Sequence, residues 1–423
     1  MSAVIGSSRS NRLPDQGLAG SGMETALCHA RIKIKPNLRG GNCNEDRDPG
    51  RISSRGDRRL AAGLCQRRSG RAGPHQHVYP AITAGAPPDS PLAHVDPNVL
   101  ASSFSGVVSI NIRYNNANGV QQSFICSGTL VSSRDVVTAG HCVDTNGNGT
   151  VIDLTKAGSD VRVVFNSNGT ANAVITADKV SMNPNYQGFG VCPAGVNNFC
   201  VNDDVAVIHL GADAPASAKI YRTYTGEVGS GQLITMVGYG TSGDGINGFT
   251  IDPSFFVKRS GQNIMDLFDG NDENDFGGPN EVWYADFDGG GQNTFCTYFG
   301  VCTPTLANNR ESGIGGGDSG GAAFMRIGAE DFLVGTDTFS QRFTIGGVTQ
   351  TAGTFGTAFG GILLNSYMDY LELATNGAIE GFKVPEPGSL PLVGIALLGM
   401  LGAGRRRRDC AVNVEDPARI AIG

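Results

Sequence analysis

The chain has 423 residues, a formal net charge of −7 at pH 7 and 17% charged residues. The charge is divided unevenly, because residues 1–75 hold 14 of the 32 Lys and Arg residues with six acids, whereas residues 76–404 hold 13 basic and 30 acidic residues. This acidic balance argues against nucleic acid as a partner, since phosphate binding requires a surface rich in Lys and Arg.

The first segment, residues 1–75, combines basic residues with Gly and Ser clusters and has almost no apolar periodicity. Such a sequence cannot bury a core, so we expect a disordered basic segment. It also lacks an apolar stretch long enough for a secretory signal. Two explanations stay open: a mis-assigned start or upstream frame error, or a genuine basic extension of the protein.

Short β-rich runs separated by Gly, Asn and Asp turns fill residues 76–383, which we expect to form one domain. The predicted strands lie at residues 106–112, 161–165, 205–210, 233–238, 281–287 and 332–335. Helical periodicity is scarce before residues 366–375, where one short helix is predicted. Residues 261–300 are rich in Asp, Asn and Gly, and we expect them to form a surface loop insertion. The predicted fold class is therefore all-β.

Three short motifs that carry reactive side chains follow one another within this domain. They read Val-Thr-Ala-Gly-His-Cys at 137–142, Asn-Asp-Asp-Val-Ala-Val-Ile at 202–208 and Gly-Gly-Gly-Asp-Ser-Gly-Gly at 315–321. A serine hydroxyl is a weak nucleophile, so acyl transfer requires an imidazole base and oriented N–H donors for the oxyanion. Ser319, His141 and Asp204 supply the nucleophile, the base and the acid that orients the base. Each motif alone is typical of an ordinary loop, core residue or strand cap, but the ordered set favours catalysis.

This ordered set resembles the chymotrypsin-like serine peptidases of the trypsin fold, over roughly residues 100–375. The resemblance implies two packed six-stranded antiparallel β-barrels, with His141 and Asp204 on the first, Ser319 on the second and the cleft between them. It also implies an oxyanion hole formed by the N–H groups of Gly317 and Ser319. The predicted activity is that of a serine endopeptidase that cleaves proteins or peptides through an acyl-enzyme and requires no cofactor. The alternative is a catalytically silent surface protein that uses the fold for adhesion or calcium-dependent binding.

The resemblance also places the primary substrate pocket, with Gly313, six positions before the nucleophile, at its base. Its wall is formed by Thr338, Phe339 and Ser340. An uncharged floor removes the electrostatic reason to select Lys or Arg, unless Glu311 or Asp337 reaches in from elsewhere. We therefore expect a preference for small or medium apolar side chains.

Peptidases of this fold are activated by a cut before an Ile-Val-Gly-Gly segment, whose new ammonium pairs with the Asp beside the nucleophile, here Asp318. This chain contains no such segment, and its nearest stretch is Ile-Thr-Ala-Gly at 82–85, with no basic residue directly before it. Three explanations stay open: another partner for Asp318, a different maturation cut, or an unreliable N-terminal sequence.

Six of the ten cysteines lie within the domain, and four of these close short loops of the kind that oxidising compartments preserve. The predicted pairs are Cys192–Cys200, Cys296–Cys302 and, by the family resemblance, Cys126–Cys142. Zinc binding is disfavoured because no His or second Cys stands at zinc spacing.

The loop after the histidine places oxygen side chains at alternating positions, with Gly at the sixth. This pattern is typical of the first half of a calcium loop, in which Asp144, Asn146 and Asn148 would be ligands. Thr155 stands at the twelfth position, where a chelating Glu is expected. A solvated turn rich in Asp and Asn is the alternative to a structural calcium ion.

The C-terminal segment, residues 384–408, contains a Pro-Glu-Pro spacer, an apolar stretch at 390–403 and four arginines at 405–408. The apolar stretch is somewhat short for a bilayer span, and the arginines are a basic stop that stays cytoplasmic. The pattern resembles the PEP-CTERM sorting signal of Gram-negative bacteria, which implies export, recognition by an exosortase and a transmembrane anchor before processing. We expect the protein at the cell surface or in the extracellular matrix. A short tail, residues 409–423, follows this segment.

Overall fold

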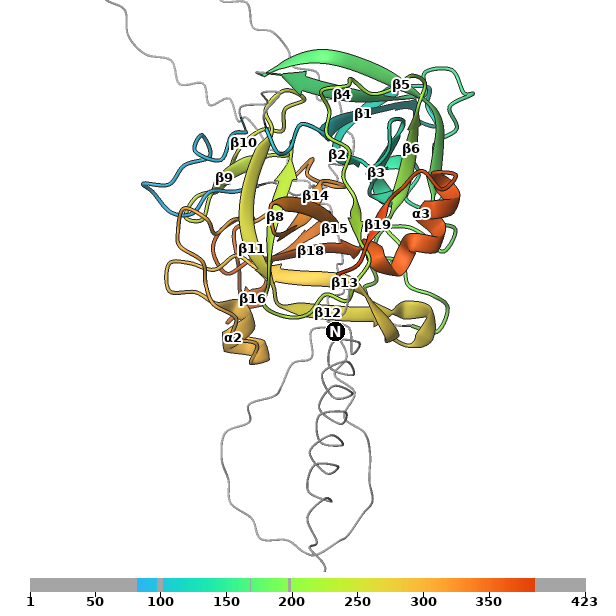
Figure 1. Ribbon diagram of the computed structural model, residues 1–423. Coiled ribbons are helices and arrows are strands. Elements are labelled where there is room, and N and C mark those ends of the chain that lie inside the picture. Colours follow the sequence, from blue (N-terminus) through green and yellow to red (C-terminus); the bar gives the residue numbers. More distant parts are fainter. Residues whose placement is uncertain (1–81, 97–101, 168, 197–198, 385–423) are drawn as a thin grey trace, which may run out of the picture. The chain divides into compact units, whose positions relative to one another are not determined.

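The computed structural model describes residues 82–96, 102–167, 169–196 and 199–384 (Figure 1). The predicted basic segment 1–75, the apolar stretch 390–403 and the tail 409–423 lie outside these residues. Within the described part of the chain, none of the helices has the length and apolarity that a bilayer crossing requires. Strands predominate among the described residues, so the predicted all-β class is confirmed.

Six strands of the first half close into an antiparallel β-barrel, in the hydrogen-bonded order β1-β2-β3-β6-β5-β4. They are β1 (Val107–Asn115), β2 (Gln121–Leu130), β3 (Asp135–Thr138), β4 (Asp160–Ser167), β5 (Thr170–Met182) and β6 (Ala206–Leu210). β-branched residues fill the interior: Ile110, Ile112 and Val163 are fully buried together. The first predicted barrel is therefore confirmed.

Alternate residues of β3 and β6 belong to two different cores, because successive side chains of a strand leave it on opposite faces. Val136 and Ile208 lie in the core inside the barrel. Val137 and Val207, their neighbours in the chain, lie in a second apolar cluster that includes residues of the later sheet, such as Phe324. The strand before His141 and the strand after Asp204 are thus anchored on both faces.

The second half forms a nine-stranded sheet whose main order is β11-β8-β14-β15-β18-β13-β12. Its strands are β7 (Thr223–Tyr224), β8 (Gln232–Gly238), β11 (Arg259–Met265), β12 (Leu267–Asn271), β13 (Gly277–Asp286), β14 (Ala322–Ile327), β15 (Glu330–Gln341), β18 (Ala358–Leu363) and β19 (Gly381–Phe382). Strand pairing does not close this sheet as it closes the first barrel, so the second six-stranded barrel is only partly realised. However, β11 and β12, at opposite ends of the order, are separated only by Asp266, whose N–H donates to the Tyr284 carbonyl of β13 at 2.8 Å. The sheet therefore curls until its two ends meet.

The prediction of a surface loop insertion at residues 261–300 is wrong. Much of this region forms β11, β12 and β13, and Trp283 and Phe287 lie in the apolar core of the second sheet. The reason is that β11, with the sequence Arg-Ser-Gly-Gln-Asn-Ile-Met, has little intrinsic strand preference but pairs with β8 along all seven residues. Tertiary pairing overrides local preference here.

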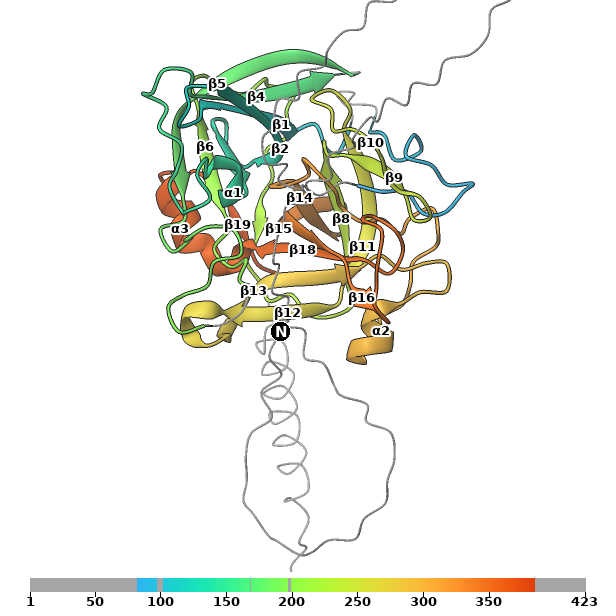
Figure 2. The same ribbon diagram turned by 180° about the vertical axis from the view of Figure 1, so that it is seen from behind.

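The helices are short and flank the strands. They are α1 (Gly140–Val143), η1 (Asp272–Asn274), α2 (Thr294–Phe299), η2 (Leu364–Tyr367) and α3 (Met368–Ala374). Two small hairpins are formed by β9 (Ser242–Asp244) with β10 (Gly248–Ile251) and by β16 (Thr344–Ile345) with β17 (Val348–Thr349). The predicted C-terminal helix is confirmed as η2 and α3, and α3 lies beside β6 in both views (Figures 1 and 2). Tyr370 Oη on α3 lies 3.3 Å from Ser181 Oγ on β5, so this helix packs against the first barrel.

Candidate active site

His141 and Asp204 are joined by two hydrogen bonds. Asp204 is fully buried, its Oδ2 lies 2.7 Å from Nδ1 of His141, and its Oδ1 accepts the backbone N–H of His141 at 2.6 Å. Because an ionised carboxylate can only accept, this arrangement places the imidazole proton on Nδ1 and leaves Nε2 able to take a proton. The side chain of His141 is 11% exposed, which leaves one edge of the imidazole accessible.

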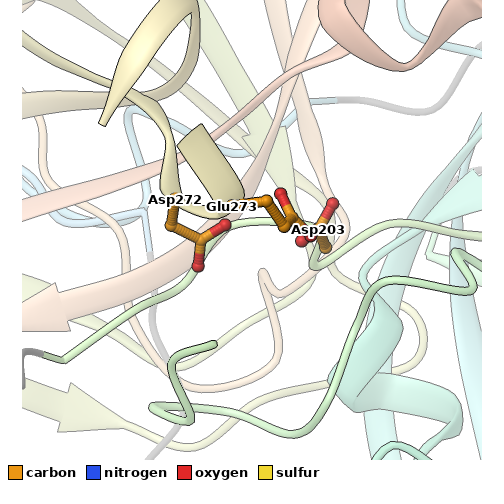
Figure 3. A group of neighbouring side chains, drawn as sticks. All are labelled: Asp203, Asp272 and Glu273. Atoms are coloured by element: carbon orange, nitrogen blue, oxygen red, sulfur yellow. The ribbon is translucent and has the colours of Figure 1, made fainter. Parts of the chain in front are cut away.

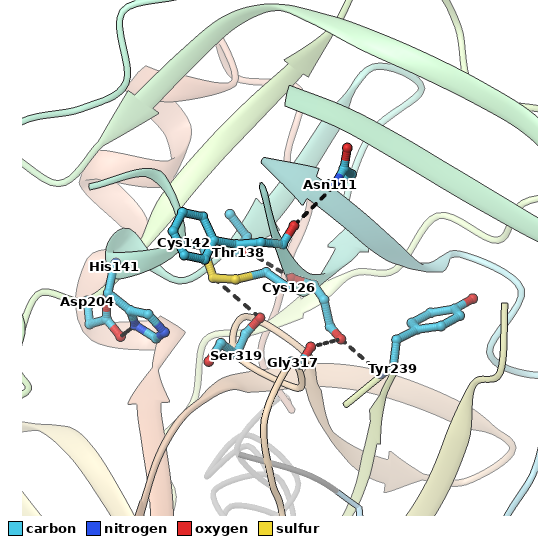
Figure 4. The surroundings of a disulfide bond; sticks show 11 residues. Asn111, Cys126, Thr138, His141, Cys142, Asp204, Tyr239, Gly317 and Ser319 are labelled. Atoms are coloured by element: carbon cyan, nitrogen blue, oxygen red, sulfur yellow. Dashed lines mark hydrogen bonds and ion pairs between the residues drawn. A yellow bond between two sulfur atoms is a disulfide. The ribbon is translucent and has the colours of Figure 1, made fainter. Parts of the chain in front are cut away.

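The predicted disulfide between Cys126 and Cys142 is present and fixes the helix that carries His141. It joins β2 to α1, with the two Cα atoms 6.3 Å apart (Figure 4). The two cysteines are 16 positions apart, and closing a loop of that length stabilises a fold by about 3 kcal/mol. The imidazole is thus held from one side by a carboxylate and from the other by a covalent bridge.

A tight turn before β6 positions Asp204. Asp203 has a φ of 64°, a left-handed conformation that Asp adopts more readily than most residues. The N–H of Asp203 donates to Tyr367 Oη at 2.9 Å, and Tyr367 belongs to the apolar cluster shared by the two halves. The helix η2, which follows the last long strand of the second sheet, therefore helps to hold the acid of the first barrel.

Ser319 lies in a buried loop directly before β14. Its carbonyl oxygen accepts the N–H of Ser127 at 2.8 Å and lies 3.6 Å from Sγ of Cys142. The disulfide sulfur carries no proton, so the second distance is a contact and not a hydrogen bond. Ser127 Oγ also donates to the carbonyl of Gly317 at 2.8 Å. The loop that carries Ser319, in the second half of the chain, is therefore hydrogen-bonded to β2, the strand that carries Cys126.

The hydroxyl of Ser319 is buried and forms no hydrogen bond with any described residue. Catalytic hydrogen bonds are often long before substrate binds, so this geometry is compatible with a nucleophile. The backbone N–H groups of Gly317 and Ser319 likewise donate to no acceptor within the described ranges. Two unused donors beside a serine hydroxyl are what a developing oxyanion requires.

Gly320 is the position in this loop where a side chain is least tolerable. Its φ is 76°, and a Cβ there would lie 2.6 Å from the backbone N of Ala139 and 2.1 Å from Thr138 Oγ1. We expect Gly320→Ala to lower the free energy of unfolding by at least about 3 kcal/mol, because left-handed strain and a backbone clash add together. Chemical denaturation followed by fluorescence would measure this change.

Gly346→Ala is the matched control, since Gly346 has a φ of 58° and no atom within 4 Å of its added Cβ. It suffers the backbone strain alone, at a cost of about 1–2 kcal/mol. Equal losses in the two variants would contradict the close packing of the serine loop against the histidine segment.

Asp318, beside the nucleophile, is buried against the first described residues of the chain. Its Oδ1 accepts the N–H of Gly240 at 2.8 Å, its Oδ2 accepts that of Gly315 at 3.3 Å, and the backbone N–H of Ile82 donates to the same carboxylate. Burial raises the pKa of Asp318 to about 7. Ile82 itself is 1% exposed. The segment that contains Ile82, far upstream of the serine motif, thus contacts the acid next to Ser319.

Gly313, the predicted pocket base, has uncharged neighbours. Its N–H donates to Thr83 Oγ1 at 3.0 Å, and its carbonyl accepts the N–H of Thr83 at 3.0 Å. A Cβ at this position would lie 3.1 Å from Thr83 Oγ1 and 3.5 Å from the ring of Phe287. Thr83 directly follows Ile82, so one segment touches both Asp318 and the base of the predicted pocket.

The predicted pocket wall lies on β15, at a point where its pairing with β18 is interrupted between Asp337 and Phe339. Thr338 and Phe339 are buried, whereas Ser340 is exposed. The ring of Phe339 packs edge-on against Tyr284, with ring centroids 5.3 Å apart. The irregular pairing makes Thr338 the extra residue of a β-bulge, a feature that often re-aims side chains near active sites.

Two acids close to this region differ in how they are held. The carboxylate of Glu311 accepts three hydrogen bonds, from Asn263 Nδ2, the N–H of Asp288 and the N–H of Leu306. Asp337 is fully buried, and neither of its side-chain oxygens has a partner among the described residues. Burial, with a smaller effect of nearby Asp318, raises the pKa of Asp337 well above its ordinary value. Burial therefore favours the uncharged form of the Asp337 carboxyl.

The loop that the sequence identifies as a candidate calcium site is held by its own backbone. The carboxylate of Asp144 accepts the N–H groups of Asn146, Gly147 and Gly149 at 2.8–3.2 Å. Hydrogen bonds of this kind occur in turns rich in Asp and Asn, and calcium binding by Asp144, Asn146 and Asn148 stays a prediction. The two remaining predicted disulfides, Cys192–Cys200 and Cys296–Cys302, are both present.

Two neighbours of the site were not predicted from the sequence. Phe189 packs edge-on against the imidazole of His141, with ring centroids 5.2 Å apart, and is 41% exposed. No motif singles out this phenylalanine, because its position depends on the fold of a long loop. The second neighbour is Ile82: Ile-Thr-Ala-Gly at 82–85 is the stretch nearest to an Ile-Val-Gly-Gly segment, but the sequence does not predict the contact of Ile82 with Asp318.

A closed β-barrel and a curled second sheet, with a histidine–carboxylate pair on the first and a serine loop on the second, define the trypsin-like class of fold. Residues 101–251 match the family model described as Trypsin, and residues 383–408 match the PEP-CTERM protein-sorting motif. The chain therefore carries a trypsin-like domain and a PEP-CTERM motif, and both resemblances inferred from the sequence are confirmed.

The sequence identities to individual known proteins are low. Brachyurin of Leptuca pugilator is 24% identical over 133 residues, which are 31% of this chain and 51% of that protein. The chain thus matches about half the length of this curated relative. A solved structure described as HL collagenase is 15% identical, with a TM-score of 0.38, and the alignment covers 64% of this chain and 94% of that chain.

Proposed function

We propose that the protein is an exported serine endopeptidase in which His141, Asp204 and Ser319 form the catalytic triad. The observation that carries this proposal is the double hydrogen bond between Asp204 and His141, beside a disulfide whose sulfur contacts Ser319. The carboxylate fixes the tautomer of the imidazole, and the bridge fixes its position relative to the serine loop. Matches to a trypsin family model and to brachyurin support the same class of activity.

In the proposed reaction, Nε2 of His141 takes the proton of Ser319 as Oγ attacks the carbonyl carbon of a peptide bond. The negative charge that develops on the carbonyl oxygen is bound by the N–H groups of Gly317 and Ser319. His141 then gives its proton to the leaving amine, which departs and leaves an acyl-enzyme. A water molecule, deprotonated by His141, hydrolyses the ester and restores the serine.

The residues around Gly313 support a preference for small or medium apolar side chains. Thr83 and Phe287 are its uncharged neighbours, burial raises the pKa of Glu311 to about 8, and burial raises the pKa of Asp337 well above its ordinary value. Burial thus disfavours the negative charge that would select a Lys or Arg side chain of a substrate.

We further propose that maturation cuts the peptide bond before Ile82. The backbone N–H of Ile82 already donates a hydrogen bond to the carboxylate of Asp318. A new ammonium formed at that nitrogen would therefore meet a buried carboxylate without a rearrangement of the residues around Ile82. The PEP-CTERM motif indicates export, and we propose surface or matrix sorting by an exosortase-type enzyme. The substrates would then be proteins or peptides outside the cell.

Labelling with a fluorophosphonate probe tests the nucleophile. We expect the chain cut before Ile82 to be labelled at Ser319, as mapped by mass spectrometry, and the same cut chain carrying Ser319→Ala to lose the label, because only an activated serine attacks the probe. Ser230→Ala, at an exposed turn, should label as the wild type does. A folded, disulfide-bonded and cut protein that is not labelled would contradict the proposal and favour a binding-only surface protein.

A further inference from the structure

Three carboxylates from two distant parts of the chain meet beside the catalytic segment. Asp203 directly precedes Asp204, while Asp272 and Glu273 open η1 between β12 and β13. One oxygen of each carboxylate lies within 4.8 Å of the others. Figure 3 shows the three side chains converging from the two segments. This carboxylate cluster therefore bridges the first barrel and the second sheet.

The cluster is buried on one side and lacks a basic partner. Asp203 and Asp272 are 4% and 3% exposed, and Glu281, which adds to the negative potential of both, is 4% exposed, whereas Glu273 is exposed to solvent. None of the ion pairs within the described ranges includes any of these four acids, which are residues 203, 272, 273 and 281. Buried charges are costly unless they are paired or bind a metal ion.

A second observation points to a ligand at this place. Asp272 Oδ1 is buried and has no hydrogen-bond partner among the described residues. One oxygen of the Asp272 carboxylate is turned toward Glu273, next to which Asp203 lies (Figure 3). By contrast, the oxygens of Glu281 accept bonds from Asn202 and Asn271. A buried acceptor without a donor is unusual, and a cation bound between the three carboxylates would satisfy it.

Protons are the competing explanation for the cluster. Burial, together with Glu273 and Glu281, raises the pKa of Asp203 to about 8 and that of Asp272 to about 7. In the absence of a cation these two carboxyls therefore hold protons near neutral pH. A divalent cation would displace the protons and convert the mutual repulsion into shared attraction.

We propose that Asp203, Asp272 and Glu273 bind a calcium ion. The donor set consists of oxygens alone, which hard cations prefer, and calcium accepts irregular geometry with six to eight ligands. The exposed Glu273 leaves one side open, so water molecules complete the coordination. The ion ties the turn before Asp204 to the loop between β12 and β13. Where the proposed triad holds, this tie also steadies the acid that orients His141.

Calcium-dependent stability tests the site without relying on catalysis. The full chain carrying Ser319→Ala, which excludes self-digestion, is freed of metal with a chelator and melted at pH 7.5 with and without 10 mM calcium chloride. Extracellular calcium sites typically have a Kd of roughly 0.1–1 mM. At that affinity, 10 mM calcium should stabilise the folded protein enough to raise the melting temperature by about 3–8 °C. In the Asp272→Asn variant we expect no shift, and titration calorimetry should show at least a tenfold loss of affinity.

Asp275→Asn is the matched control, because Asp275 is exposed in the same loop and its φ of 51° suits Asn as well as Asp. It removes one negative charge near the cluster and should keep the calcium shift. A shift that persists in Asp272→Asn, or that is lost only in Asp144→Asn, would overturn the proposal, the latter placing the ion in the loop after His141. Absence of heat and shift in the parent protein would identify shared protons as the counter-charge instead. Fluorophosphonate labelling of the serine-containing chain is scored separately, so failure of the peptidase proposal leaves the binding result intact.

Discussion

A chain that begins at Ile82 is expected to hydrolyse a peptide substrate roughly 10²–10³ times faster than the uncut chain, the magnitude associated with one oxyanion-hole donor. Asp318 is the residue directly before the nucleophile, and its carboxylate already accepts a hydrogen bond from the backbone N–H of Ile82. A charged ammonium at that nitrogen would form a buried, hydrogen-bonded ion pair that fixes the backbone between Gly317 and Ser319. A specific protease site introduced directly before Ile82 allows the rates before and after cutting to be compared.

The control for this experiment is a site moved by one position, so that the cut leaves Ala81 at the N-terminus. The ammonium then no longer coincides with the Ile82 nitrogen, and activation should fail. Asp318→Asn should also remain slow after the correct cut, because it removes the partner of the ammonium. Equal activation by both cuts would show that release of the upstream segment, and not the ion pair, is the cause.

Stability against pH gives an independent readout of the same ion pair. In the uncut chain burial raises the pKa of Asp318 to about 7. The protonated carboxyl therefore contributes its full amount to the free energy of unfolding below the unfolded pKa of about 4. This contribution is lost as the pH rises through 7. Between pH 5 and 7.5 the uncut Ser319→Ala protein should lose about 2.5 kcal/mol of its free energy of unfolding from this group. After the cut the ammonium lowers the pKa of Asp318, so this part of the loss should disappear in urea unfolding curves.

The sequence predicted those parts of the site in which local residues and chemistry coincide. His141, Asp204 and Ser319 could be found because each stands in a short motif whose neighbours serve the same chemistry: Cys142 holds the histidine helix, and Gly320 permits the serine loop. Most predicted strands were also correct, since runs of buried β-branched residues such as those of β1 and β6 pair where they are expected to.

Features that depend on contacts between distant segments could not be predicted in this way. Ile82 and Asp318 are separated by more than half of the chain, and neither residue alone indicates the contact. Asp203 and Asp272 likewise become neighbours only through the packing of the sheet against the barrel. β11 was missed because its polar sequence lacks a strand signal and its conformation comes from pairing with β8. Contacts between distant segments therefore determine both the proposed activation contact and the proposed cation site.

Asp204→Asn is expected to lower kcat by about 10⁴-fold with little change in KM. The side-chain carbonyl of Asn can still accept the backbone N–H of His141, so the loop keeps its shape. Its amide group, however, is a donor where Oδ2 accepted from Nδ1, which favours the tautomer with the proton on Nε2. That tautomer cannot take the proton of Ser319. Steady-state kinetics of the cut protein with a chromogenic peptide measures the effect, and circular dichroism verifies the fold.

Asp135→Asn provides the matched control within the same barrel. Asp135 is 2% exposed and its Oδ1 lies 2.7 Å from Nδ1 of His209, so it forms a histidine–carboxylate pair of the same length. This pair links β3 and β6 but is absent from the proposed triad. The substitution should therefore lower stability and change kcat by no more than a few-fold. Comparable losses of kcat in the two variants would mean that the effect of Asp204 is a general weakening of the barrel, and the proposed role of its carboxylate in catalysis would be wrong.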